Sequence, residues 1–77
     1  MKIHIGKHAN YFLDAAGDYG AIRTGCNNGL DIGLVHKVGN GWRGCIIGRP
    51  ETERTFASRK AAAYYVATQY DAREDRR

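Results

Sequence analysis

Seven side chains between positions 37 and 64 have chemistry that suits an anionic partner. They are Lys37, Arg43, Arg49, Arg54, Arg59, Lys60 and Tyr64. Lysine and arginine contact phosphates, arginine can also read a guanine edge through two hydrogen bonds, and an exposed tyrosine adds apolar contact. We therefore predict that these residues form a basic, tyrosine-bearing surface that binds a nucleic acid or a nucleoprotein complex.

Two of these cations stand at the predicted start of a helix, where positive charge is unfavourable. Arg59 and Lys60 directly follow Ser58. Because the N-terminus of a helix carries partial positive charge, each cation there costs about a few tenths of a kcal/mol unless an anion lies beside it. The free N–H groups of the first turn and these three side chains together suit a phosphate or a carboxylate. The alternative is that both cations extend into solvent.

The remaining reactive side chains do not form a catalytic or metal-binding set. His4, His8 and His36 are accompanied by no CxxC pattern and by no HxxxH pattern with an acidic ligand. Cys26 and Cys45 have no adjacent base, which is typical of inert, reduced thiols, and a disulfide between them is the alternative. The sequence therefore predicts a protein that is not an enzyme and holds no metal and no cofactor.

The composition predicts a small globular protein that attracts anions. The 77 residues include 12 Lys and Arg and 8 Asp and Glu, which gives a formal net charge of +4. This charge favours nucleic acid or an acidic protein surface as a partner. A core this small rarely supplies more than about 3–5 kcal/mol of net stability. A second copy of the chain, forming a homodimer, is therefore a further candidate partner.

The hydropathy of the sequence argues against a membrane partner. No apolar run approaches the length of about 20 residues that a helix needs to cross a bilayer. Residues 1–10 also lack the continuous apolar segment of a secretory signal. We predict a cytoplasmic protein.

Short apolar runs between turn residues predict an α+β protein in which one C-terminal helix packs on a small antiparallel sheet of three to five strands. The chain is expected to form a single domain over residues 1–77. Strands are expected in residues 1–29, a hairpin, a third strand and the helix in residues 30–73, and a frayed tail in residues 74–77. Turns are predicted at Gly17 to Gly20, which folds residues 21–25 back on residues 11–15, and at residues 26–29.

The strongest hairpin signal joins residues 30–38 to residues 42–49 through Gly39, Asn40 and Gly41. A two-residue loop on Asn40 and Gly41 and a three-residue loop with Gly41 in the left-handed conformation give opposite parities of strand pairing. The three-residue loop gives the cleaner separation of apolar and basic side chains. It places Ile32, Leu34, Val38, Trp42 and Ile46 on one face, and Lys37, Arg43 and Arg49 beside Val35 and Ile47 on the other.

Local signals define the end of the sheet and the helix. Pro50 cannot donate a ladder hydrogen bond, so the preceding strand is expected to stop there, with residues 50–53 reversing the chain into a third strand over residues 53–57. Ser58 is a good N-cap, and an unbroken helix should follow from Arg59 to about Arg73. Trp42 and Phe56 are expected in the core against this helix.

The stretch from Asp31 to about Tyr70 resembles the AP2 and integrase arm-binding families of small DNA-binding domains. The residues that carry the resemblance are Trp42, Phe56, Ser58, Ala62 and Ala63. The resemblance implies three antiparallel strands and one helix, with the sheet lying in the DNA major groove. Reading of the DNA would then fall on Lys37, Arg43, Arg49 and Arg54.

A second hypothesis follows from the small size of the chain and its lack of a catalytic set. In both respects the protein looks like many phage and mobile-element accessory proteins, including the anti-CRISPR proteins. The alternative function is therefore a phage-encoded inhibitor that docks on a host protein complex and blocks it sterically.

Overall fold

The computed structural model describes residues 2–5, 9–25 and 29–74, which form six strands and one helix. The strands are β1 (Lys2–Ile5), β2 (Ala9–Ala16), β3 (Tyr19–Thr24), β4 (Asp31–Val38), β5 (Gly41–Ile46) and β6 (Arg49–Phe56), and the helix is α1 (Arg59–Glu74). The α+β arrangement with a C-terminal helix agrees with the sequence, but the predicted count of three to five strands is wrong. The sheet has six strands, three of which come from the first third of the chain.

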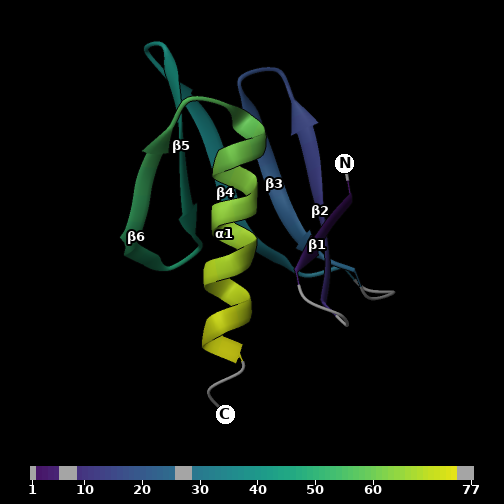
Figure 1. Ribbon diagram of the computed structural model, residues 1–77. Helices are drawn as coiled ribbons and strands as arrows, with labels where there is room; N and C mark the ends of the chain where they lie inside the picture. The colour runs from purple at the N-terminus through teal and green to yellow at the C-terminus, as the bar shows by residue number, and fades with distance from the viewer. Residues whose placement is uncertain (1, 6–8, 26–28, 75–77) are drawn as a thin grey trace.

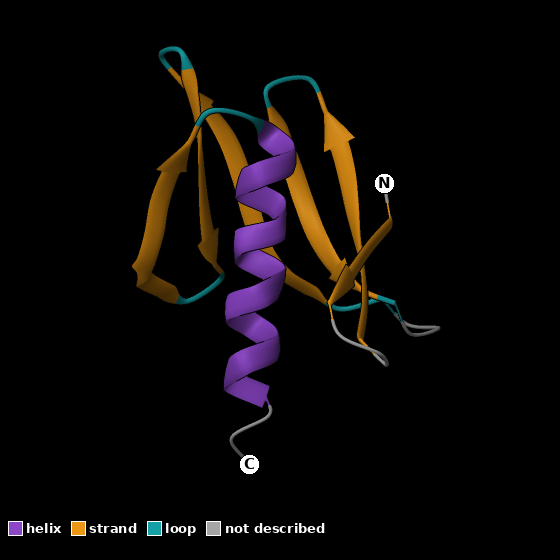
Figure 2. Cartoon of the chain, viewed as in Figure 1, coloured by secondary structure: helices purple, strands orange, loops and turns teal. Residues whose placement is uncertain are grey.

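All six strands form one antiparallel sheet in which each strand pairs with the next along the chain, in the order β1-β2-β3-β4-β5-β6. The helix α1 packs on one face of this sheet, over its middle strands, and no described helix covers the other face (Figures 1 and 2). We call these two sides the helix side and the uncovered face. Among the described residues, no helix combines the length and apolar character needed to cross a membrane.

The hairpin between β4 and β5 has a register different from the predicted one. Val38 pairs with Gly41 and Lys37 with Trp42, so the loop has the two residues Gly39 and Asn40, and Gly39 takes a φ of 56°. A positive φ at the first loop residue matches the turns that follow the twist of paired strands. The shift of parity moves Leu34 and Val38 to the uncovered face.

The chain reverses between β5 and β6 earlier than predicted. Ile46 pairs with Arg49 across a turn at Ile47 and Gly48, where Gly48 takes a φ of 78°. Residues 50–53 therefore belong to β6 instead of reversing the chain. Pro50 is tolerated because β6 is an edge strand, where a backbone N–H that points outward needs no partner.

The helix lies close to the sheet because its inner residues are small and meet glycines. Ala62, Ala63, Val66 and Ala67 are all buried. A Cβ atom on Gly33 would collide with one methyl of Val66, and a Cβ on Gly44 would lie 2.9 Å from the other. The two methyl groups of Val66 therefore occupy the space that these glycines leave open.

Some of the predicted end signals are confirmed and others are corrected. The backbone N–H of Ala61 donates to Ser58 Oγ at 3.1 Å, which confirms Ser58 as the N-cap. Trp42 and Phe56 are only partly buried and border the core, whose largest fully buried side chains are Ile3, Ile22, Val35 and Val66. The predicted tail at 74–77 lies outside the described residues apart from Glu74, the last residue of α1, and so does most of the turn predicted at 26–29.

Candidate functional site

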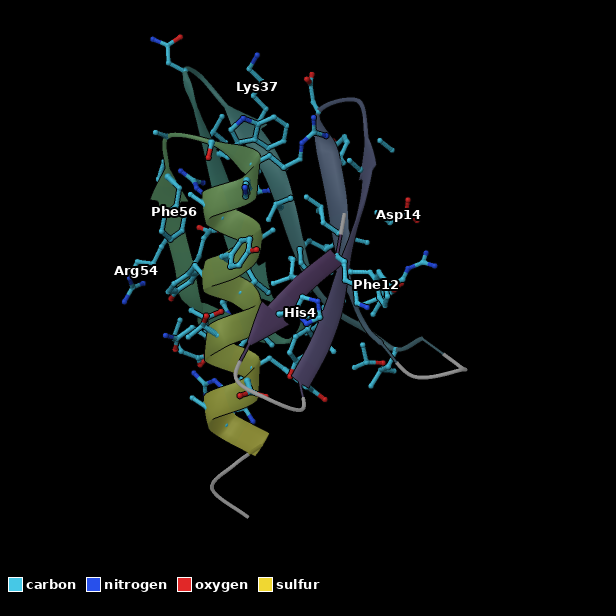
Figure 3. All side chains as sticks on the ribbon, turned by 45° about the vertical axis from the view of Figure 1, so that its right-hand side comes forward. His4, Phe12, Asp14, Lys37, Arg54 and Phe56 are labelled. Carbon is cyan, nitrogen blue, oxygen red and sulfur yellow. The ribbon has the colours of Figure 1, made fainter. Side chains whose placement is uncertain are left out.

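The structure distributes the seven predicted site residues over both sides of the sheet. Arg43 pairs with His36 on the uncovered face, whereas Lys37 pairs with Trp42 and Arg54 with Gly44 on the helix side. Arg59, Lys60 and Tyr64 belong to α1. Arg49 begins β6, at the end of that strand away from the start of α1 (Figure 1). Lys37, by contrast, lies at the same end of the molecule as the helix start (Figure 3).

From the start of the helix, the Arg59 side chain reaches back over the sheet. Its guanidinium carbon lies 4.5 Å from the centre of the Trp42 ring, a cation–π contact. Its Nη1 donates hydrogen bonds to the carbonyl oxygens of Gly17 at 3.0 Å and Tyr19 at 3.2 Å. These contacts attach the first turn of α1 to the β2–β3 turn, and they move the charge away from the helix axis, where the dipole would oppose it.

Lys60 and Tyr64 lie one helical turn apart and both are exposed. Residues spaced by four on a helix share one face, so the ammonium group and the phenol ring present a common surface to solvent. Tyr64 is 37% exposed, while Tyr65 beside it packs its ring 5.0 Å from that of Phe56 and donates its hydroxyl to the Thr52 carbonyl oxygen. Tyr64 is therefore available for contact and Tyr65 is part of the packing.

Arg54 covers the free edge of β6. Its Nη1 donates to the carbonyl oxygens of Glu53 at 2.7 Å and Glu51 at 3.2 Å. In Figure 3, Arg54 and Phe56 lie along β6, while Phe12 and Asp14 project from β2 on the side away from α1. The Arg54 charge is thus located on the outer border of the helix side.

The ion pairs of the described residues lie on the uncovered face. In the described part of the chain, ion pairs form only around Arg23 and Arg43, both on the uncovered face. Arg23 contacts Asp31 at 2.9 Å and Asp14 at 3.5 Å, and Arg43 contacts Glu53 at 3.6 Å. The residues Lys37, Arg54, Arg59 and Lys60 have no carboxylate at ion-pair distance among the described residues. Together with Tyr64 we call these four the basic surface.

The described residues offer little reactive chemistry. Cys45 carries a free thiol on the uncovered face, and partial burial, followed by the negative charge of Glu53, raises its pKa. A raised pKa keeps the thiol protonated, which weakens it as a nucleophile. No group of three His, Cys, Asp or Glu side chains is placed to hold a metal ion within residues 2–5, 9–25 and 29–74.

The sequence did not reveal the character of the uncovered face. Phe12, Tyr19 and Leu34 are all exposed there, beside the Arg23 ion pairs. The alternation of polar and apolar residues in β2 and β3 was the available signal, but reading it required the pairing register. Comparisons of the chain with models of protein families, with curated proteins and with solved structures find no match.

Proposed function

We propose that this protein is a non-catalytic binding protein that contacts nucleic acid, alone or within a nucleoprotein complex, through the basic surface. The observation that carries the proposal is the lack of ion pairs at Lys37, Arg54, Arg59 and Lys60 among the described residues, beside an exposed Tyr64. A cation that has no carboxylate partner is free to neutralise a phosphate. A paired cation such as Arg43 must first give up its own carboxylate.

Two features of the basic surface favour phosphate contact. The cations come from a strand end, an edge strand and the first turn of a helix, so they line a surface instead of a single point. Arg59 is already fixed by Trp42 and by two carbonyl oxygens, which reduces the entropy that a contact would cost. Phosphate contacts release counterions, and Tyr64 adds an apolar contact that salt does not weaken.

The AP2-like resemblance implies a different binding mode, with the uncovered face in the major groove. The charge distribution favours the helix side instead. Of the four residues that the resemblance assigns to DNA reading, only Arg43 lies on the uncovered face, and it is paired with Glu53. Asp14, Asp31 and Glu53 on that face would repel phosphates.

The proposal is tested by two double variants that remove the same charge from different places. Lys37→Gln/Lys60→Gln neutralises the basic surface near the start of α1. Arg49→Gln/Arg73→Gln removes two charges from the opposite end of β6 and from the last turn of α1. Fluorescence anisotropy with a short duplex and with a single strand, over a range of salt, gives the slope of log affinity against log salt. The first variant should flatten the slope by about two, and the second should leave it nearly unchanged.

Equal slopes for both variants would show that the cations act only through net charge, and would contradict a defined basic surface. No binding to either nucleic acid at low salt would overturn the proposal. The alternative, an inhibitor of phage origin that docks on a host protein complex, would then be the hypothesis to pursue by purification from host extracts.

A further inference from the structure

We propose that two copies of this chain pack through the uncovered faces of their sheets, forming a dimer with the two α1 helices on the outside. The proposal concerns the side of the sheet that the basic surface does not occupy, and it stands independently of nucleic-acid binding. We identify the partner on this face as a second copy of the chain for three reasons. They are the net charge of the face, the edges of the sheet, which do not favour strand pairing, and the area of the face.

The uncovered face has an apolar centre. Leu34 is 47% exposed, and its cross-strand neighbours are Ala21 on β3 and Cys45 on β5. Phe12 is 40% and Tyr19 66% exposed on the same face. Face-to-face packing of two sheets buries side chains of this kind in a layer about 10 Å thick. The helix α1 lies on the other side of the sheet, so no described helix covers this layer.

The charges of the uncovered face are balanced within the chain. Strand register and the Arg43–Glu53 ion pair place three cations on this face, Lys2, Arg23 and Arg43, and three carboxylates, Asp14, Asp31 and Glu53. The face therefore carries 3 − 3 = 0, whereas the whole chain carries +4. The excess positive charge thus lies elsewhere. Two uncovered faces can meet with little repulsion, but contacts between other faces would bring unpaired cations together.

The edges of the sheet do not favour association by strand pairing. The strand β1 at one edge has only 4 residues. The strand β6 at the other edge contains Pro50, and Arg54 already donates to two of its carbonyl oxygens. Short edge strands, proline and charged side chains all block the addition of another strand. Self-association is therefore directed to the uncovered face.

The area is sufficient for a weak, specific dimer. Strands about 4.8 Å apart and about six residues long, at about 3.3 Å per residue, give a six-stranded face of about 500 Å². Two such faces would bury about 1,000 Å² in total, which is at the lower limit for specific interfaces. We therefore expect a dimer whose population depends on protein concentration in the micromolar range or above.

Sedimentation equilibrium of Leu34→Gln and Tyr64→Gln tests the proposal. Both side chains are large and exposed, at 47% and 37%, but Tyr64 lies on α1, on the other side of the sheet. The wild type should approach the mass of two chains as concentration rises. Leu34→Gln should weaken the dimer at least about tenfold, because each dimer loses two buried leucines, and Tyr64→Gln should not. Circular dichroism checks that both variants are folded.

A wild type that stays monomeric up to millimolar concentration would overturn the proposal, and so would equal weakening by the two variants. A second readout locates the interface. In a Cys26→Ser background, alkylation of Cys45 should slow as the wild-type sequence dimerises, and Leu34→Gln should remove this protection. Cys45 that reacts at the same rate at every protein concentration, in samples whose mass shows a dimer, would place the interface elsewhere and contradict the proposal.

Discussion

On the helix side of the sheet, Lys37, Arg54 and Arg59 have no carboxylate at ion-pair distance among the described residues. On the uncovered face, Arg23 and Arg43 both form ion pairs. The same residue types therefore have different availability on the two sides. A net charge of +4 is modest for the whole chain, but it is concentrated because one face balances its own charges. The difference teaches that the location of unpaired charge, more than its total, indicates where an anion can bind.

The packing of α1 decides which side of the sheet is covered, so the largest expected effect comes from disturbing it. Gly33→Ala should cost about 3 kcal/mol, because the added Cβ collides with Val66 and has no space to relax. Thermal unfolding measures the loss, with Gly29→Ala as the control, since a Cβ at Gly29 would meet nothing closer than 3.8 Å. Equal stability of the two variants would contradict the close helix packing.

A double-mutant cycle identifies the collision partner. Val66→Ala removes both methyl groups that face Gly33 and Gly44, and alone it should destabilise the core by about 1–3 kcal/mol. Combined with Gly33→Ala it should cost less than the sum of the two single effects, with a coupling of about 1 kcal/mol. Rescue should be partial, because the new Cβ would also lie 2.8 Å from the Cys45 carbonyl oxygen. Additive costs would show that Val66 is not the partner.

A smaller effect is expected at Arg59, which connects the helix side to the β2–β3 turn. Arg59→Ala should cost about 1 kcal/mol, since the cation–π contact with Trp42 and two partly solvated hydrogen bonds are lost. Trp42 is the single tryptophan, so its fluorescence emission should change as well. Lys60→Ala is the control, because the structure gives the exposed Lys60 no contact with the indole. A Trp42 spectrum unchanged by Arg59→Ala would contradict the stacked geometry.

The smallest effect concerns the thiol on the uncovered face. Burial and Glu53 raise the pKa of Cys45, so its alkylation should require a higher pH than that of an ordinary thiol. Glu53→Gln should move the pH profile part of the way back, in a Cys26→Ser background. Because an unfolded thiol loses its proton at lower pH than the folded one, this group's contribution to stability falls as pH rises above the ordinary thiol pKa. A pH profile of alkylation like that of free cysteine would show that Glu53 does not raise the pKa of Cys45.

Local features of the fold could be predicted from the sequence, and features that depend on pairing could not. Ser58 and the start of α1 were predictable because a cap and an uninterrupted helical run act within a few residues. The hairpin register was not, since loops of two and three residues fit the same glycines and differ by one residue of parity. That error placed Leu34 in the core, and it placed Lys37 on the face of the sheet that does not carry Trp42.

The candidate site was limited by the same dependence on distant contacts. Lysines and arginines are visible in the sequence, but their ion pairs are not. The partners of Arg23 come from β2 and β4, and that of Arg43 comes from β6. Arg59 lies over Trp42 only because the helix returns across the end of the hairpin. The sequence therefore identified the cations but not which of them are free.

The separation of the two faces is tested most directly by the salt dependence of duplex binding for Leu34→Gln beside that for Lys37→Gln/Lys60→Gln. The duplex should be too short to reach two outward-facing helices at once. We predict that Leu34→Gln keeps the wild-type slope of log affinity against log salt, while the double lysine variant loses about two units of slope. A slope lost by Leu34→Gln and kept by the double lysine variant would place nucleic acid on the uncovered face and contradict both proposals.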